Sequence, residues 1–341
     1  MTGWSVGEPT SVGLPAPDAL HPSGPLPVQG RGVGAGVRVD LGETGLSVFP
    51  LALGGAEFGW NVDVEASHAV LDSYAERGGN MVHTADSFSG GRSEHIIGQW
   101  LRTRGTRDAT VVAVRVGRHP DNPGLGSVNL VRAVEASLRR LDTDRIDVLY
   151  LDAHAGDAAP LEDTLATAEW LVDSGKVRAL GAYGYAATQL VEARILSSAG
   201  YPRLTVLDVP YSVVRQDELD GDLRLVAGAQ GMAVTPSHAL AHGFLAGAQR
   251  ARSRVVRSVR GQQVAAGLTR RGTRILRALD AVGAELSIPV AAVAVAWLLA
   301  QRIITAPIVN AFAPAHVDEL VQGVGARLSR AQLADIARAA A

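Results

Sequence analysis

Short apolar runs alternate with helical patterns along almost the whole sequence, and this alternation limits the possible folds more than any other feature. Each apolar run is followed by a segment whose apolar residues recur at the 3.6-residue spacing of a helix face. Eight such units in about 300 residues favour a closed parallel (β/α)8 barrel, the TIM barrel. The runs expected to form its strands are 50–53, 81–84, 110–116, 146–151, 177–182, 204–209, 232–236 and 303–309.

An open, doubly wound α/β sheet is the alternative arrangement of the same units. It is disfavoured because no Gly-x-Gly-x-x-Gly sequence follows the first strand. A β-hairpin is expected just before the barrel, and Asp63 and Ser127 are expected to N-cap helices. Residues 1–35, rich in Gly, Pro, Ser and Val, are expected to form a flexible arm. The chain is thus predicted to be a single α/β domain over 36–341.

Composition excludes several classes of protein. Hydrophobic residues make up 47% of the chain and charged residues 19%, which is enough apolar material for a large core. The 32 basic and 34 acidic residues give a net charge of −2, so the overall charge does not favour nucleic-acid binding. Because there is no cysteine, disulfides, thiolate metal sites and cysteine nucleophiles are excluded. We find no apolar run of about 18 residues and no secretory signal pattern, and we therefore expect a cytoplasmic protein.

Ionisable residues stand at the ends of three consecutive expected strands: His83, Arg115 and Asp152. In TIM barrels the catalytic residues lie at the C-terminal ends of the strands, and neighbouring strands are about 4.8 Å apart. We therefore expect an Arg115–Asp152 ion pair beside His83. In this catalytic site His83 or Asp152 would move a proton, and Arg115 would hold an anionic substrate group. The alternative is a salt bridge that closes the barrel mouth without catalysis.

Aromatic side chains are expected around the same mouth, although aromatic residues make up only 5% of the chain. A pocket lined by rings suits a large apolar or polycyclic small-molecule substrate, and ordinary loop packing is the alternative interpretation. The residues expected to bind substrate are Trp60, Phe88, Tyr183, Tyr185, Asp208, Tyr211, His238 and Phe312.

Two further patterns bear on partners. No two histidines have i, i+4 spacing on an expected helix near an acidic ligand, so no metal site is expected. Arginines are dense over 250–277, and no acidic residue occurs between Phe244 and Leu279. This segment is either a docking surface for an acidic carrier protein or a phosphorylated ligand, or a solvated face. The second reading is natural in a chain whose only lysine is Lys176, since arginine is its default basic residue.

Seven segments, in order along the chain, resemble the aldo-keto reductase superfamily over about residues 37–340. The resemblance implies a TIM barrel without a separate dinucleotide domain, and hydride transfer between NADPH and a carbonyl compound. The segments are LGETGLSVFPLALGGAEFGW at 41–60, HTADSFSGGRSEHIIG at 83–98, SLRRLDTDRIDVLYL at 137–151, GKVRALGAYG at 175–184, VPYSVVRQDE at 209–218, LAHGFLAG at 240–247 and APIVNAFAP at 306–314.

The four catalytic positions of that family are all changed in this sequence. The resemblance places His83 at the family's aspartate, Phe88 at its tyrosine general acid, Arg115 at its lysine and Asp152 at its histidine. Phe88 has no ionisable proton and cannot protonate an alkoxide. Arg115 stays charged and cannot be tuned as a lysine can.

The positions that hold the dinucleotide in the family are altered as well. The serine–asparagine pair is Tyr183–Gly184, and the glutamine position is Asp208, whereas Tyr211, at the position expected to stack on the ring, is kept. The phosphate-binding turn is 310–312, where Phe312 replaces an arginine. The sequence therefore predicts that no cofactor is bound, with NADPH as the alternative.

These observations leave three candidate functions. The first is a redox-neutral enzyme (a cyclase, dehydratase, lyase or isomerase) acting on a small molecule in bacterial specialised metabolism. The second is an NADPH-dependent oxidoreductase that takes its proton from His83, Asp152 or water. The third is a non-catalytic binding or regulatory barrel.

Overall fold

The computed structural model describes residues 37–156, 159–247 and 260–341. The expected flexible arm, 1–35, lies outside these residues. The expected hairpin is present: β1 (Val39–Asp40) pairs antiparallel with β2 (Ser47–Val48).

Eight parallel strands form one sheet in the order β10-β3-β4-β5-β6-β7-β8-β9. The two end strands meet as well, because the backbone N–H of Thr305 donates to Val234 O at 2.8 Å and that of Ile308 donates to Pro236 O at 2.8 Å. The predicted (β/α)8 barrel is therefore confirmed. The strands are β3 (Ala52–Gly54), β4 (Met81–Ala85), β5 (Val111–Val116), β6 (Ile146–Asp152), β7 (Val177–Tyr183), β8 (Leu204–Asp208), β9 (Ala233–Val234) and β10 (Ile308–Val309).

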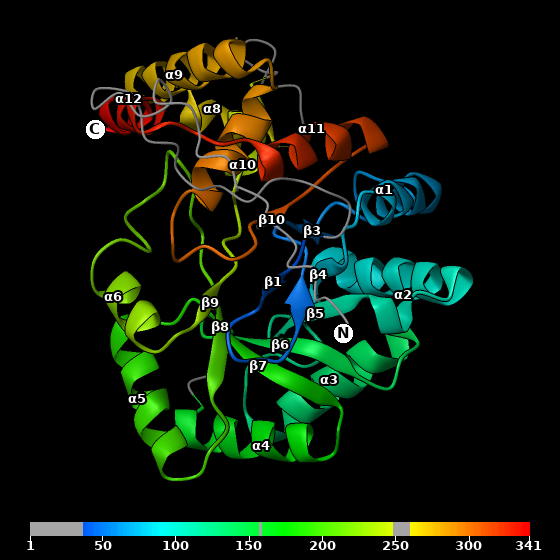
Figure 1. Ribbon diagram of the computed structural model, residues 1–341. Coiled ribbons are helices and arrows are strands. Elements are labelled where there is room, and N and C mark those ends of the chain that lie inside the picture. The colour runs from blue at the N-terminus through cyan, green and yellow to red at the C-terminus, as the bar shows by residue number, and fades with distance from the viewer. Residues whose placement is uncertain (1–36, 157–158, 248–259) are drawn as a thin grey trace, which may run out of the picture.

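Helices surround the barrel on all sides (Figure 1). The helix α9 packs against α10 and α12. The short helix α8 packs against the loop after β9. The helices are α1 (Val64–Glu76), α2 (Arg92–Arg104), α3 (Ser127–Leu141), α4 (Leu161–Asp173), α5 (Ala187–Ser198), α6 (Asp222–Ala229), α8 (Gly261–Gly267), α9 (Arg270–Leu286), α10 (Val290–Leu299), α11 (Pro314–Gly325) and α12 (Arg330–Ala340).

Local sequence signals explain most helix ends. Asp63 caps α1 by accepting a hydrogen bond from the backbone N–H of Ala66 at 2.9 Å, as expected. The expected cap at Ser127 is wrong, because Ser127 is the first helical residue and the N-cap is Gly126. Within the described chain no single helix is long and apolar enough to span a membrane; α9 and α10 meet that test only together, with a 95° bend between them.

The barrel interior is apolar at one end and polar at the other. At the N-terminal ends of the strands the hairpin acts as a plug, since Val39, Leu41, Leu46 and Val48 pack against the inward-pointing side chains. Further along lies the buried ring of Tyr150, and a Cβ at position 181 would come within 2.5 Å of it. Glycine at 181 thus leaves space for this ring. The ionisable groups lie beyond it, towards the C-terminal ends of the strands.

Candidate active site

Four ionisable side chains meet at the C-terminal ends of the strands: His83 on β4, Arg115 on β5, Asp152 on β6 and Asp208 on β8. His83, Asp152 and Asp208 are buried, and Arg115 is only 13% exposed. Strand register explains this grouping, because inward-pointing positions alternate along each strand; Arg115 is aligned with Ala85, so His83 lies two residues deeper along β4. The three residues predicted to be catalytic are thus brought together, although their catalytic role stays a prediction.

Asp152 binds a partner that sequence reasoning missed. Its Oδ2 lies 2.7 Å from Nε of Arg118, and its Oδ1 accepts the backbone N–H of His154 at 2.9 Å. The expected ion pair with Arg115 is also present, with Nε 3.6 Å from Oδ2, and is longer than the pair with Arg118. Arg118 lies in the loop after β5. Nothing in the sequence around a loop arginine indicates which carboxylate it will bind.

The guanidinium of Arg115 lies over two aromatic rings. Its Cζ is 4.1 Å from the ring centre of Tyr183 and 5.5 Å from that of Phe88. Such cation–π contacts hold the planar group in one orientation. Apart from the long contact to Asp152, the Arg115 side chain forms no hydrogen bond with any residue that the structure describes. Its N–H donors are therefore available to a ligand.

His83 is paired with Asp208 rather than with the Arg115–Asp152 pair. Its Nε2 lies 3.8 Å from Asp208 Oδ2, and neither atom has a hydrogen-bond partner among the residues described. The imidazole packs edge-on to the rings of Phe88 and Tyr150, at 6.2 and 5.6 Å between centres. The pairing joins strands on different sides of the barrel, and so it depends on barrel closure.

Burial reverses the expected proton chemistry of this pair. Desolvation, aided by the positive charge of Arg115, lowers the pKa of His83 to about 3, so the histidine is neutral near pH 7. Desolvation raises the pKa of Asp208 to about 6, although Arg115 and the N–H of Ser237 oppose this. Of the two groups, Asp208 therefore has the pKa closer to neutral pH, although the ordinary value for histidine is the higher one.

The expected aromatic rim is only partly formed. Phe88 and Tyr183 face the ionisable cluster, but Tyr185 and Tyr211 are buried in the core between barrel and helices. Tyr211 stacks on Trp297 at 5.7 Å between ring centres, so that ring face is already occupied. The other two rings, Trp60 and Phe312, are about half exposed, at 54% and 44%.

Arg260 connects the loop after β3 with the loop after β9. This arginine forms an ion pair with the buried carboxylate of Glu57, lies 5.4 Å from the Trp60 ring centre, and approaches Nδ1 of His242 at 3.3 Å. His242 packs against His238, whose pKa burial lowers to about 4, with the neighbouring imidazole and arginines adding to the effect. Within the described ranges no cluster of three or more His, Asp or Glu side chains could hold a metal ion.

The arginine-rich segment 250–277 is only partly described, since 248–259 lie outside the described residues. Arg260 is engaged at the mouth, and Arg271 donates to the backbone oxygens of Ala340 and Val214. Arg270, Arg274 and Arg277 are exposed at i, i+4 and i+7 on α9 and form no ion pair with another described residue. Docking of an acidic carrier protein at this face stays a prediction.

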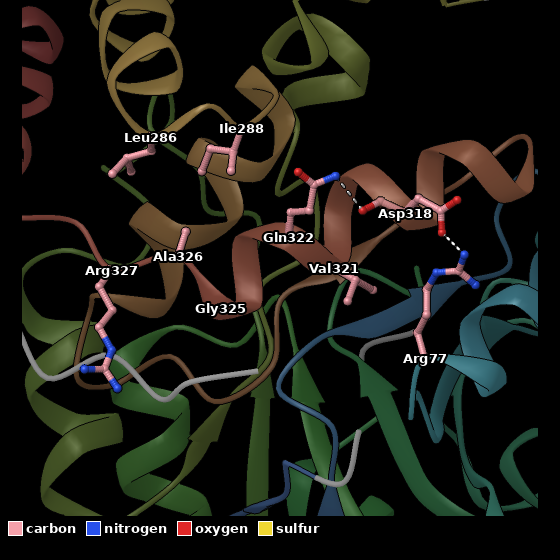
Figure 2. A pocket seen from close by; sticks show the side chains of 9 residues that line it. All are labelled: Arg77, Leu286, Ile288, Asp318, Val321, Gln322, Gly325, Ala326 and Arg327. Carbon is pink, nitrogen blue, oxygen red and sulfur yellow. Dashed lines mark hydrogen bonds and ion pairs between the residues drawn. The ribbon is translucent and has the colours of Figure 1, made fainter. Parts of the chain in front are cut away.

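Two surface hollows lie away from the candidate active site. One, of about 480 Å³, is formed by α1, α11 and the turn after α9; Arg77 forms an ion pair with Asp318 on one side of it, and Leu286 and Ile288 lie on the other side (Figure 2). The other, of about 750 Å³, lies beside the hairpin at Gly42. The first hollow adjoins the C-terminal ends of α1 and α11, which run antiparallel to the strands. Both hollows therefore lie towards the N-terminal ends of the strands.

A closed parallel barrel with its ionisable groups at the C-terminal ends of the strands is the arrangement of TIM-barrel enzymes. The family model of the aldo/keto reductase family matches residues 50–341, and the chain belongs to this family.

Three relatives illustrate the range of similar proteins. The chain is 31% identical to aldo-keto reductase ausK of Aspergillus calidoustus over 316 residues, covering 85% of this chain and 78% of that protein. It is 30% identical to the uncharacterized oxidoreductase YrpG of Bacillus subtilis over 298 residues, covering 82% and 87%. It is 28% identical to a probable voltage-gated potassium channel subunit beta of Oryza sativa subsp. japonica over 284 residues, covering 80% and 86%.

Family membership corrects the expectation about the cofactor. Aldo-keto reductases typically use NADP(H), so the prediction that the protein works without a cofactor is wrong. Buried Oγ atoms of Ser212 and Ser237 and buried Oδ1 of Asn310 follow the neighbouring strands β8, β9 and β10 without a hydrogen-bond partner in the described chain. Amide, hydroxyl and phosphate groups of a dinucleotide can satisfy such atoms, so these residues fit NADP(H).

One departure from the family pattern has a structural cause. Gly184 occupies the family's asparagine position, has φ of +71° and lies beside His154, whose ring a Cβ at 184 would approach to 2.5 Å. The imidazole takes the space that a larger side chain would need. Whatever holds the nicotinamide amide in this protein is therefore not a side chain at position 184.

Proposed function

We propose that the protein is an NADP(H)-linked oxidoreductase that interconverts a carbonyl compound and an alcohol, with Asp208 as the proton donor. One observation carries the proposal: a fully buried carboxyl group, with Oδ2 free of hydrogen bonds, lies among the residues that replace the family's catalytic positions. Family membership and the names of the reductase relatives support the hydride chemistry.

Bound NADPH would supply a hydride to the carbonyl carbon, and Ser212, Ser237 and Asn310 would help to hold it. The carbonyl oxygen then needs a proton, which Phe88 cannot provide. Protonated Asp208 can donate from Oδ2, while the N–H of Ser237, at 3.1 Å from Oδ1, fixes the carboxyl and stabilises the carboxylate that remains. A donor with a pKa of about 6 is well matched to a reaction near neutral pH.

His83 and Arg115 assist in different ways. Neutral His83, 3.8 Å from Asp208, cannot form an ion pair with it. Because the imidazole carries no positive charge, it does not favour loss of the proton from the Asp208 carboxyl group. Arg115 supplies a fixed positive charge that orients the substrate beside Asp208. Asp152 acts as a positioning residue, because it binds Arg118 and limits the movement of Arg115.

A redox-neutral acid–base reaction is the second candidate. It is favoured by the loss of the phenol at Phe88 and by two carboxyl groups, Asp152 and Asp208, in unequal environments. Unequal carboxyl groups can serve as acid and base in one reaction. The two candidates differ in stoichiometry, because only the oxidoreductase consumes one NADPH for each product molecule.

The test measures loss of reduced nicotinamide absorbance with a panel of aldehydes and ketones, together with product yield. Asp208→Asn should lower kcat by about 10²–10⁴-fold, the usual contribution of a general acid. Asp222→Asn, at an exposed position at the start of α6, is the matched control and should have no effect. Formation of product without oxidation of NADPH would favour the redox-neutral candidate. If no carbonyl compound gives either product or NADPH oxidation, both candidates are refuted.

A further inference from the structure

We propose that the carbonyl substrate carries a carboxylate, as an oxo acid does, and that Arg115 binds this group. The inference rests on the proposed function and specifies its substrate class. Arg115 is almost buried, yet its guanidinium donates no hydrogen bond within the described chain. A desolvated charge without hydrogen bonds is costly, and an anionic ligand is the natural partner for it.

When Asp208 is protonated, the charge of Arg115 is not matched by the protein. The nearest carboxylate, Asp152, already forms an ion pair with Arg118 at 2.7 Å and accepts the N–H of His154 at 2.9 Å. Two arginines therefore share one carboxylate, and one positive charge remains at the bottom of the mouth. The other nearby carboxyl, Asp208, is neutral when it acts as proton donor. A ligand with a single negative charge balances this cluster.

The surroundings of Arg115 favour a planar anion. Tyr183 and Phe88 cover the guanidinium at 4.1 and 5.5 Å, so that a ligand reaches its N–H groups at the edge. A carboxylate accepts two parallel hydrogen bonds from such an edge. A phosphate can accept two parallel hydrogen bonds from a guanidinium as well, and it is therefore the competing anion in the test below. The same two rings offer apolar surface to the rest of the substrate.

Binding of the carboxylate would also affect the proton donor. The positive charge of Arg115 opposes protonation of Asp208, because it favours the carboxylate form. A substrate anion on Arg115 cancels this influence and favours the protonated acid. The pH above which kcat falls should therefore be higher than the pH above which kcat/KM falls, since kcat/KM reports the free enzyme.

The probes are pyruvate, phenylglyoxylate and phenylpyruvate, their methyl esters, and inorganic phosphate, titrated by calorimetry into the full-length protein. Each acid should bind more tightly than its ester, with a difference on the order of 100-fold for the best pair, as expected for charge-assisted hydrogen bonds. Arg115→Met should remove this difference, and Arg115→Lys should restore only part of it. Arg102→Met, an exposed arginine on α2, is the control and should bind as the unchanged protein does.

Two further outcomes separate the possible anions. Arg115→Met should leave the dissociation constant of NADPH within about threefold; a loss of tenfold or more would mean that Arg115 binds a cofactor phosphate, and would overturn the inference. Acids that bind no better than their esters, or phosphate that binds more tightly than every acid, would overturn it as well. NADPH oxidation with esters and acids alike would refute the inference but not the proposed function. Acid binding without NADPH oxidation would support the anion site and refute the proposed function.

Discussion

The buried Asp208 predicts a pH dependence of folding stability that one substitution should remove. Its pKa is about 6 in the folded protein against an ordinary value of 3.8, because burial disfavours the carboxylate. Each pKa unit corresponds to about 1.4 kcal/mol. The stabilisation from this proton is complete below pH 3.8, declines as the pH rises to about 6 and is then lost. Its loss amounts to about 3 kcal/mol.

Asp208→Asn keeps the size and one acceptor oxygen of the side chain but cannot lose a proton. The free energy of unfolding of the variant, minus that of the unchanged protein, should therefore increase by about 2–3 kcal/mol between pH 4 and pH 7. The measurement is urea unfolding followed by circular dichroism at several pH values. His83 has the opposite dependence, with stability lost as the pH falls below 6.5, but it is present in both proteins and largely cancels from the difference.

Parallel stability curves for the two proteins between pH 4 and pH 7 would refute this reasoning. They would mean that Asp208 is hydrated in solution and has an ordinary pKa. The proposed role of Asp208 as proton donor would then lose its physical basis, whatever the activity of the variant. Asp222→Asn is again the control, because an exposed carboxyl should change little between the two states.

Three further predictions follow from individual contacts. Arg140→Met removes the partner of the buried Glu94 carboxylate, which Arg140 contacts at 2.5 Å. Urea unfolding should show a loss of stability of about 3–5 kcal/mol at pH 8 and a clearly smaller loss at pH 5. An equal loss at both pH values would contradict a role for the charge of Glu94. Gly181→Ala should destabilise by about 1–3 kcal/mol because the new methyl group meets a ring inside the barrel, whereas Gly228→Ala, in α6 with its nearest atom at 3.9 Å, should be neutral or stabilising. Since Phe312 stands where the family has an arginine, calorimetry should give NADPH and NADH dissociation constants within about tenfold of each other, and a strong preference for NADPH would show that another cation binds the 2′-phosphate.

The barrel could be predicted from the sequence because its determinants are local and repeated. Strand-length apolar runs and helix-period segments such as 127–141 each specify an element, and eight such units have few ways to bury their apolar faces. The ends of the elements were less accurate. Ser127 is the first residue of α3 rather than its cap, and β9 and β10 contain only two paired residues each, because strand pairing and backbone geometry decide those limits.

The positions of the site residues at one end of the barrel also followed from the sequence, because strand direction and alternation put His83, Arg115 and Asp152 there. Their partners followed only in part. Asp152 forms the expected ion pair with Arg115 at 3.6 Å, but its shorter ion pair, with Arg118 at 2.7 Å, depends on the position of the loop after β5. His83 meets Asp208 only because the sheet closes and brings β4 and β8 to a common interior.

The sequence by itself determined the periodicity, the kinds of ionisable group present and the absence of a phenol at Phe88. Only the tertiary structure decided which of those groups can exchange a proton near neutral pH. A pKa depends on how much water and which charges surround a group, and for Asp208 and His83 both are supplied by segments distant in the chain. Burial therefore makes the carboxyl the titrating group and leaves the histidine neutral, the reverse of what their ordinary pKa values indicate.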